Sequence, residues 1–555
     1  MYKPREVVTQ TVAILGGGIG GLSAAHELIE RGFEVTVNEA KGRFGGKARS
    51  IPISDETQVL GEHGFRFFPG FYRHVTDTMS RIPYGEHHTV ADNLVPTSQS
   101  LMARMTGEEA VASTKTPETL DEWAETLRPG NSSNSLSGSE ARFFAERMLT
   151  LLTSCDKRRE NELENISWWD YIEAERMSEP YQQLAAVTQL LVALRPQDGS
   201  ARTFGQIYLQ LIRGQLDPTM EAERILNGPT SKAWIEPWVT YLQDNGVEFV
   251  HDAPVTAINC TRERVTSVTV DRAGSTEEVQ ADYYVAALPV EAMVELLTEE
   301  LRRGAPSLAR LDRIDTGWMS GIQFYLSEDT PLVHGHQLYL DSPWALTSIS
   351  QQQFWEEYTL SGESDGTIEG VLSVIISDWD KPGILYDKPA RDCTPDEIKA
   401  ETWAQLKAHL NRNGTERLSD DVLVESFLNP AIEETDTGVV NREPLLVNTA
   451  GSLRYRPSAA TKLENFVLAS DYVRTNTDLA SMESANEAAR RAVNAILKHS
   501  GVRAPYCKIW ELEEPRIFKP LKAQDAIRYQ LGLPHPGETF KGISTPSRML
   551  SLRSR

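Results

Sequence analysis

The hydrophobic pattern is clearest near the start of the chain. Residues 11–15 form a short apolar run rich in β-branched side chains, which is typical of a buried parallel strand. Residues 22–28 then place apolar side chains at helical spacing, and Gly32 marks the predicted end of that helix. Residues 33–37 predict a second strand. Together these segments predict one β–α–β unit within about 30 residues.

The periodicity changes along the rest of the chain. It is mostly helical from about residue 140 to 245 and mostly strand-like from 247 to 290. The later strands favour an antiparallel sheet. The full pattern predicts strands at 247–250, 255–258, 265–270, 283–287, 318–326, 336–349, 368–378 and 466–469, a loop or hairpin at 361–366, and helices from Pro289 to Leu297 and from Met482 to Lys498.

Composition and charge narrow the function classes. The chain has 555 residues, of which 40% are hydrophobic, so a sizeable core is available. Its 56 basic and 79 acidic residues give a net charge of −23. A phosphate backbone would be repelled by such a surface, which argues against a nucleic-acid partner.

Cysteine spacing and hydropathy bear on compartment and metal binding. No C-x-x-C spacing occurs, so we expect neither a disulfide framework nor a clustered metal site. No apolar window of about 20 residues predicts a membrane-spanning helix, and we see no secretory signal. We expect a cytoplasmic protein, with peripheral membrane contact left open because the tail carries Arg548, Arg553 and Arg555. The four cysteines are Cys155, Cys260, Cys393 and Cys507.

A glycine-rich turn joins the first strand to the first helix. Its G-x-G-x-x-G is formed by Gly16, Gly18 and Gly21, with Gly20 inside the motif. These glycines allow a tight turn, close approach to a pyrophosphate and close helix packing, and the helix N-terminus attracts phosphates. Glu39 follows the second strand, where a carboxylate binds ribose hydroxyls. The turn therefore predicts FAD or NAD, and the acid disfavours NADP.

The residues after Glu39 decide between these two cofactors. Residues 39–48 resemble the E-A-x-x-R-x-G-G-[RK] segment of the flavin-containing amine oxidase and phytoene desaturase superfamily. The resemblance implies that FAD is the cofactor. It also implies cofactor contacts from Ala40, Arg43, Gly45, Gly46 and Lys47, in which the arginine neutralises the pyrophosphate and the glycines lie against the flavin end.

Later segments extend the resemblance. Residues 465–472 and 479–485 are similar to the family's A-G-D strand and to the L-A-S-M-E-G-A of plant-type carotenoid desaturases, although serines stand at 470 and 484 where glycines are usual. The resemblance implies that Asp471 holds ribityl hydroxyls and that Ser481 and the N–H of Met482 face the flavin. It further implies adenine contacts from Val255.

Residues 61–72 follow the first motif, and the family's equivalent loop passes along the flavin. Gly64, Phe65 and Arg66 are therefore implied as cofactor contacts. No catalytic side chain is identified from the sequence. Four weak candidates are Arg66, His63, Lys232 and Tyr472. The aromatic pairs Trp168–Trp169 and Trp234–Trp238 fit either the core, which we favour, or the wall of an apolar tunnel.

The fold class that follows is α/β: a doubly wound, Rossmann-like FAD-binding domain with an inserted α+β substrate domain. We predict that residues 1–80, 226–300 and 447–500 form the FAD-binding domain. Residues 81–225 and 301–446 would form the substrate domain, and 501–555 a C-terminal extension.

The implied activity is an FAD-dependent oxidoreductase, a dehydrogenase or desaturase that passes hydride from a substrate C–H to flavin N5. The substrate would be a small molecule of the apolar isoprenoid or polyene class, with oxygen or a quinone as external electron acceptor. Three alternatives stay open: a flavin amine oxidase acting on a C–N bond, a hydroxysqualene dehydroxylase-like enzyme, and a non-enzymatic prenyl-protein escort. The oligomeric state is not indicated.

Overall fold

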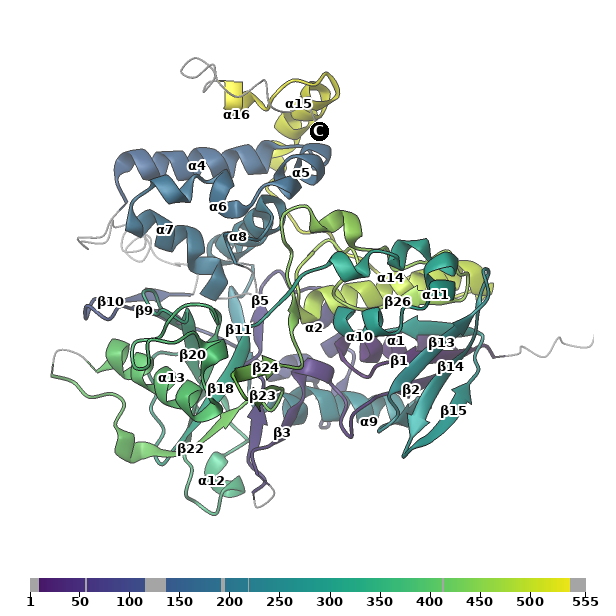
Figure 1. Cartoon of the computed structure of the whole chain (residues 1–555), viewed down its shortest axis with the longest axis horizontal. Helices are drawn as coiled ribbons and strands as arrows, with labels where there is room; N and C mark the ends of the chain where they lie inside the picture. Colours follow the sequence, from purple (N-terminus) through teal and green to yellow (C-terminus); the bar gives the residue numbers. More distant parts are fainter. Residues whose placement is uncertain are drawn as a thin grey trace, which may run out of the picture.

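The computed structural model describes residues 9–54, 57–114, 136–190, 195–217, 219–411 and 414–539. Figure 1 shows a helical layer built around α4 to α8 at the top, an α/β region at the lower right and a large sheet at the lower left. The cofactor motifs lie in the α/β region.

The α/β region is built on a five-stranded parallel sheet. Its strand order is β12–β2–β1–β16–β26, and every pair is parallel. Helix α1 (Ile19–Ile29) packs beside α14 (Met482–Ser500), so the first and last predicted helices are neighbours. The doubly wound α/β fold is thereby confirmed. The strands are β1 (Thr11–Leu15), β2 (Glu34–Asn38), β12 (Glu248–Val250), β16 (Tyr283–Ala286) and β26 (Phe466–Leu468).

A seven-stranded mixed sheet forms the second region, in the order β10–β9–β19–β20–β21–β18–β22. Helix α13 (Pro395–Leu410) packs on one face, where its Trp403 joins a cluster with Phe324. The other face packs Tyr325 and Ile375 against Phe65, in the loop that follows the glycine motif. The strands are β9 (Gln99–Ala103), β10 (Glu109–Ser113), β18 (Ser320–Leu326), β19 (Gln337–Tyr339), β20 (Leu346–Ser350), β21 (Gly370–Ile376) and β22 (Leu423–Leu428).

Two predicted segments differ in the structure. Residues 336–349 form two strands, β19 and β20, because Pro343 lacks an N–H and Ala345 turns the chain with φ +48°. The loop or hairpin predicted at 361–366 begins instead with the short helix α12 (Leu360–Glu363).

The helical layer contains α4 (Gly138–Thr153), α5 (Asp156–Asn161), α6 (Trp168–Tyr171), α7 (Glu179–Ala186) and α8 (Ala201–Leu216). Trp168 stacks on Phe204 with ring centroids 5.1 Å apart and is fully buried, so this tryptophan belongs to the core. Phe204 lies in the same buried cluster as Leu15 of β1. One continuous core therefore joins the helical layer to the parallel sheet.

Smaller elements connect these regions. The strands are β3 (Ser50–Pro52), β4 (Leu60–Glu62), β5 (Phe67–Pro69), β6 (Pro83–Tyr84), β7 (His88–Thr89), β8 (Leu94–Pro96), β11 (Glu223–Leu226), β13 (Val255–Cys260), β14 (Val265–Arg272), β15 (Ser275–Val279), β17 (Thr316–Gly317), β23 (Ile432–Thr435), β24 (Gly438–Asn441) and β25 (Leu445–Leu446). The helices are α2 (His74–Met79), α9 (Glu236–Asp244), α10 (Val290–Glu295), α11 (Glu299–Gly304), α15 (Lys519–Gln530) and α16 (Pro536–Thr539). Within the described residues, no helix is both long and apolar enough to cross a membrane.

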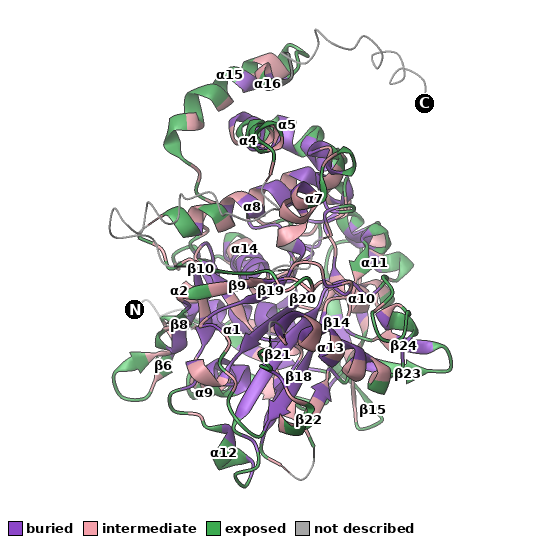
Figure 2. Ribbon diagram, turned by 90° about the vertical axis from the view of Figure 1, so that its left-hand side faces the viewer, coloured by how far each residue is buried: buried purple, intermediate pink, exposed green. Residues whose placement is uncertain are grey.

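The C-terminal arm, residues 501–539, returns to the helical layer. Figure 2 shows α15 and α16 at the top of the molecule beside α4 and α5. Asp525 of α15 is fully buried and accepts from the Nε of Arg158 at 3.0 Å and from the backbone N–H of Cys155 at 2.9 Å. This ion pair holds α15 on the layer.

We predict that Asp525→Ala releases α15 from the helical layer. Arg158 and the Cys155 N–H would each lose a charged acceptor, which costs about 1.5–3 kcal/mol of local stability. Amide hydrogen exchange should rise across residues 519–530, and Asp525→Asn, which keeps an acceptor for Cys155, should show a smaller rise. Unchanged protection in Asp525→Ala would contradict this role.

The same contact should depend on pH. Burial alone would raise the pKa of Asp525, but the hydrogen bonds from Arg158 and Cys155 hold it below its ordinary value. Stabilisation from a depressed carboxyl pKa is present above the unfolded value, about 3.9, and is lost as the pH falls through the folded value. Protection of α15 should therefore be constant near neutrality and decrease only in acid.

Candidate cofactor and substrate site

The glycine turn has the geometry of a phosphate loop. Gly16 has φ +100°, a conformation that favours glycine. A Cβ on Gly20 would lie 1.9 Å from the carbonyl oxygen of Ala469, and one on Gly21 would lie 1.9 Å from that of Gly16. Backbone therefore passes directly against backbone, and α1 starts at Ile19 with its N-terminus at the turn. Both halves of the predicted cofactor site meet here.

Glu39 lies at the end of β2 and is buried. Its Oε2 accepts from the N–H of Gly17 at 2.7 Å, and its Oε1 accepts from the N–H of Lys41 at 3.0 Å. Each carboxylate oxygen has a second lone pair available for a ribose hydroxyl. The structure thus fixes the acid at the glycine turn, as a ribose acceptor requires.

The segment after Glu39 folds back onto the same turn. Gly45 has φ +106° and donates its N–H to the carbonyl of Gly17 at 2.8 Å. Gly46 has φ +57°, and a Cβ there would lie 2.9 Å from the Cα of Gly18. Lys47 forms an ion pair with Glu291 at 2.8 Å. Ala40 and Arg43, the other two predicted contacts of this segment, are exposed.

A buried ion network supports the segment around Asp471. Arg456 is fully buried and donates to the carbonyl of Asp471 at 2.8 Å and to that of Tyr472 at 3.0 Å. It also pairs with Asp478, which in turn pairs with Arg202. Burial would raise the pKa of Asp478, but the two guanidinium groups hold it below its ordinary value. Asp471 itself is half-buried.

Helix α14 starts next to this network. Ser481 is its N-cap and accepts from the N–H of Ser484 at 3.2 Å, while the Oγ of Ser484 accepts from the N–H of Leu479 at 3.2 Å. The serine at 484, unusual for the resemblance, therefore takes part in the cap. Met482 begins the helix and is half-buried, so its N–H lies at the positive end of the helix dipole.

The loop at 61–68 supplies a half-buried cation, Arg66. The Nη2 of Arg66 donates to the carbonyl of Lys47 at 2.8 Å, whereas its buried Nε has no hydrogen-bond partner among the described residues. Gly64 has φ +154° and lies against Ile375. A buried donor without a partner, beside a glycine cradle, fits a polar cofactor at this place.

The other three catalytic candidates, His63, Tyr472 and Lys232, are not suited to transfer a proton near neutral pH. Burial, with the neighbouring Arg66 charge, lowers the pKa of His63 to about 3, so its imidazole is neutral near pH 7. Burial also raises the pKa of Tyr472. Lys232 is 54% exposed and pairs with Glu236 at 3.0 Å, so it is not assembled with the loop.

Val255 and the pair Trp234–Trp238 are the remaining residues singled out from the sequence. Val255 is half-buried at the start of β13, just after Ala253, whose N–H donates to the carbonyl of Glu39 at 2.9 Å. Trp234 and Trp238 are fully buried and stack with centroids 5.9 Å apart, so they belong to the core and do not wall a tunnel.

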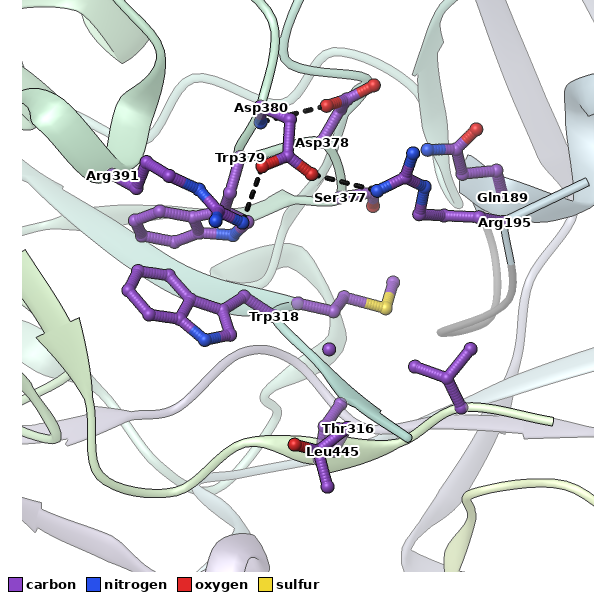
Figure 3. Close-up of a pocket in the computed structure, with 13 residues that line it drawn as sticks. Gln189, Arg195, Thr316, Trp318, Ser377, Asp378, Trp379, Asp380, Arg391 and Leu445 are labelled. Atoms are coloured by element: carbon purple, nitrogen blue, oxygen red, sulfur yellow. Dashed lines mark hydrogen bonds and ion pairs between the residues drawn. The ribbon is translucent and has the colours of Figure 1, made fainter. Parts of the chain in front are cut away.

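A cavity of about 230 Å3 lies between the helical layer, the large-sheet region and the strand pair β17–β25 (Figure 3). Trp318, Met319, Leu445 and Val447 contribute apolar wall, and Gln189 and Arg195 come from the helical layer. Lys47 donates to the carbonyl of Pro444, the residue before Leu445. The side chain of Lys47, from the predicted flavin-end segment, therefore reaches the residue next to the cavity wall.

Charged side chains line the rim of this cavity. Asp380 pairs with Arg195 at 2.8 Å and with Arg391 at 2.5 Å, and Asp378 pairs with Lys381 at 3.2 Å. Sequence reasoning missed this cavity and the Arg456–Asp478 network, since neither falls in a short motif. No local signal points to them, because Arg195, Arg391 and Arg456 all stand in polar or mixed stretches of the sequence.

Comparison with known proteins shows the family of the chain. The family model described as flavin containing amine oxidoreductase matches residues 19–497, most of the chain. The chain belongs to the flavin containing amine oxidoreductase family. It is 24% identical over 542 residues to the 15-cis-phytoene desaturase of Synechococcus elongatus, covering 93% of this chain and 100% of that protein.

Two further matches place the chain among its relatives. It is 24% identical over 518 residues to the zeta-carotene desaturase of a Synechocystis species, covering 88% of this chain and 97% of that protein. Among solved structures, cyclohexylamine oxidase from Brevibacterium oxydans has a TM-score of 0.59 at 15% identity, with 89% of this chain and all of that chain covered. This last likeness shows the fold alone.

Membership in this family makes the chain an FAD-dependent oxidoreductase with a small-molecule substrate and an electron acceptor. The escort alternative is thereby set aside. The residues present fit the cofactor: the glycine turn would take the pyrophosphate, Glu39 the adenosine ribose, and Arg66 with the start of α14 the flavin end.

We predict that Glu39→Ala weakens FAD binding without unfolding the chain. Loss of a charged acceptor costs about 1.5–3 kcal/mol, or roughly 10- to 150-fold in affinity. FAD retention after dilution, followed by flavin fluorescence, measures this. Glu34→Ala, an exposed acid on the same strand, serves as the control. Equal retention in both variants would show that Glu39 has no part in binding.

Proposed function

We propose that this chain is a dehydrogenase that desaturates an apolar, isoprenoid-like substrate. One observation carries the proposal: the cavity has one apolar wall, formed by Trp318, Met319, Trp379, Leu445 and Val447, and both carboxylates on its polar side are already neutralised by cations. Such a cavity favours a hydrocarbon segment, because burying it from water contributes about 25 cal/mol per Å2 without polar anchors.

The electrostatics of the cavity count against an ammonium substrate. An amine would be held by an unpaired carboxylate or by the open face of an aromatic ring. Here Asp380 lies between two arginines. The guanidinium of Arg391 lies 5.3 Å from the centroid of the Trp318 ring, so a protein cation already occupies that site.

The chain's own residues would position the substrate and exclude water. When bound, FAD supplies the chemistry of the reaction, the acceptance of a hydride from a substrate carbon. Trp318 packs edge-to-face on Trp379 at 5.3 Å, which makes one wall of the cavity rigid. Near pH 7 the lowered pKa keeps His63 neutral and the raised pKa keeps the phenolic proton on Tyr472, so neither group serves as a base. The proton lost from the neighbouring carbon would pass to water at the charged rim.

The comparisons support this substrate class. The two relatives that match nearly full length are named as desaturases of phytoene and of zeta-carotene. A cavity of about 230 Å3 would enclose the reacting segment of a long chain and leave the rest outside. A hydroxysqualene dehydroxylase-like reaction would use the same apolar walls and is distinguished by its product.

An amine oxidase is the second candidate. Its support is the family model that matches most of the chain, which is described as flavin containing amine oxidoreductase. The fold is also that of cyclohexylamine oxidase.

Two further points stay predictions. They are peripheral contact with a membrane and the identity of the electron acceptor, oxygen or a quinone.

We predict that phytoene- or squalene-like hydrocarbons bleach the flavin absorbance under anaerobic single-turnover conditions, whereas primary and secondary amines do not. Bleaching by amines alone, at a rate that rises as the amine loses its proton, would support the second candidate and leave the fold and cofactor assignments intact.

We further predict that Leu445→Asp slows bleaching by hydrocarbon while FAD remains bound. A carboxylate in the apolar wall must stay hydrated, which hinders entry of the chain. A loss of at least tenfold is expected. Val111→Asp, at an exposed position on β10, is the control. Equal rates in the two variants would place the substrate elsewhere.

A further inference from the structure

The C-terminal arm exposes an unusual number of apolar side chains. Five of the fourteen large hydrophobic side chains that are exposed in the described residues lie between residues 517 and 533. Leu521 and Ile527 lie in α15, about 120° apart in a helical projection, while Ile517 lies in the 3-10 turn before the helix and Leu531 caps its C-terminus, so the four follow one another along the exposed side of this segment. We call this the α15 face, with Leu533 just beyond it; its members are 78%, 45%, 62%, 69% and 43% exposed, in chain order.

The same segment is basic in a strongly acidic chain. Arg516, Lys519 and Arg528 lie between residues 515 and 534, where the only acid is the buried Asp525, while Lys522 is offset by Glu514. Of the acids just before this segment, Glu513 and Glu514 are paired with arginines of other elements. The whole chain, in contrast, carries a net charge of −23. An anionic surface that repels most of the protein would therefore attract this segment and orient the molecule with α15 towards it.

Helix α15 cannot turn its apolar face inward. Asp525, Lys522 and Tyr529 form the inward side of the helix: Asp525 accepts from Arg158 and Cys155, Lys522 pairs with Glu514, and the Arg158 guanidinium lies 5.2 Å from the Tyr529 ring centroid. Leu521, one turn before Asp525, lies at the edge of that side. Figure 2 shows α15 at the outer end of the molecule, coloured largely as exposed. The apolar face is thus presented to the surroundings by fixed contacts.

A second copy of the chain is a poor occupant. Helix α15 has 12 residues, so its face is about 18 Å long and about 10 Å wide. That gives roughly 180 Å2, far below the ~800 Å2 that each partner buries in a stable interface. A helix with an apolar face and flanking cations is instead suited to lie in the interface of a bilayer.

We propose that the α15 face docks the enzyme on an anionic phospholipid surface. Leu521, Ile527 and Leu531 insert among the acyl chains, and Arg516, Lys519 and Arg528 meet the headgroup phosphates. The segment lies beyond residue 497, where the match to the family model ends. The proposal does not depend on the substrate class proposed above.

The test is flotation of the full-length, FAD-loaded protein with vesicles of phosphatidylcholine mixed with phosphatidylglycerol, against vesicles of phosphatidylcholine alone. We expect binding to the mixed vesicles, weakened by salt. Ile527→Gln/Leu531→Gln should lose about tenfold or more in binding. Arg516→Glu/Lys519→Glu should lose at least about 25-fold, since each cation near an anionic surface contributes about fivefold.

Matched controls keep the test specific. Ile384→Gln/Leu385→Gln removes two side chains of similar exposure from the substrate region, and Lys498→Glu reverses an exposed charge at the end of α14. Both should bind like the unmodified protein, and all variants should stay yellow and keep their Tm.

Three results would overturn the proposal. They are no vesicle binding by the unmodified protein, equal binding by the α15 variants and their controls, or a change of oligomeric state in the α15 variants. Loss of binding only on removal of residues 540–555 would assign the contact to the tail instead, and also overturn it. Since bleaching by detergent-dispersed hydrocarbon is measured separately, failure here leaves the proposed activity untouched.

Discussion

The approach of Gly20 to the carbonyl oxygen of Ala469 is the constraint on which the cofactor site depends. A Cβ on Gly20 would lie 1.9 Å from that oxygen, so the two chain segments meet backbone to backbone. They are separated by about 450 residues, and α1, which contains Gly20, also packs against α14. All intervening structure is therefore inserted between two halves of one binding site, which explains why strands from three separate segments share one parallel sheet.

A buried ion network holds the chain segment that leads into α14, which the backbone contact at Gly20 does not reach. The segment from Asp471 to Leu479 has little regular structure, and a loop of this kind needs partners for its carbonyl groups. Arg456 donates to three of them, at 471, 472 and 473, and its own charge is compensated by Asp478. Removing either partner would leave an uncompensated charge in the core. This destabilises a protein far more than replacing both partners by well-packed apolar residues does. The network thus rigidifies the part of the chain that leads into α14.

The sequence predicts the parts of the molecule that local patterns govern. The β1–α1–β2 unit, the N-terminus of α14 and the strand β26 follow from periodicity and glycine placement, and the structure contains all three. The cavity does not follow, because Trp318, Arg391 and Leu445 are brought together by tertiary contacts between segments far apart in the chain. Nor does the role of Lys232: a cation near an expected motif can equally face solvent, and the structure has it pairing with Glu236.

The C-terminal arm is joined to the cofactor site by hydrogen bonds, although it lies outside the family match. Glu483, in the first turn of α14, accepts from the N–H groups of Arg73, His74 and Val75 and from the Nδ1 of His74. The Nε2 of His74 accepts from the N–H of Trp510, so the imidazole carries its proton on Nδ1. Because Met482 precedes Glu483, the position of the arm at Trp510 bears on the N–H that would face the flavin. The arm therefore supports the cofactor site at one end while its other end presents the α15 face.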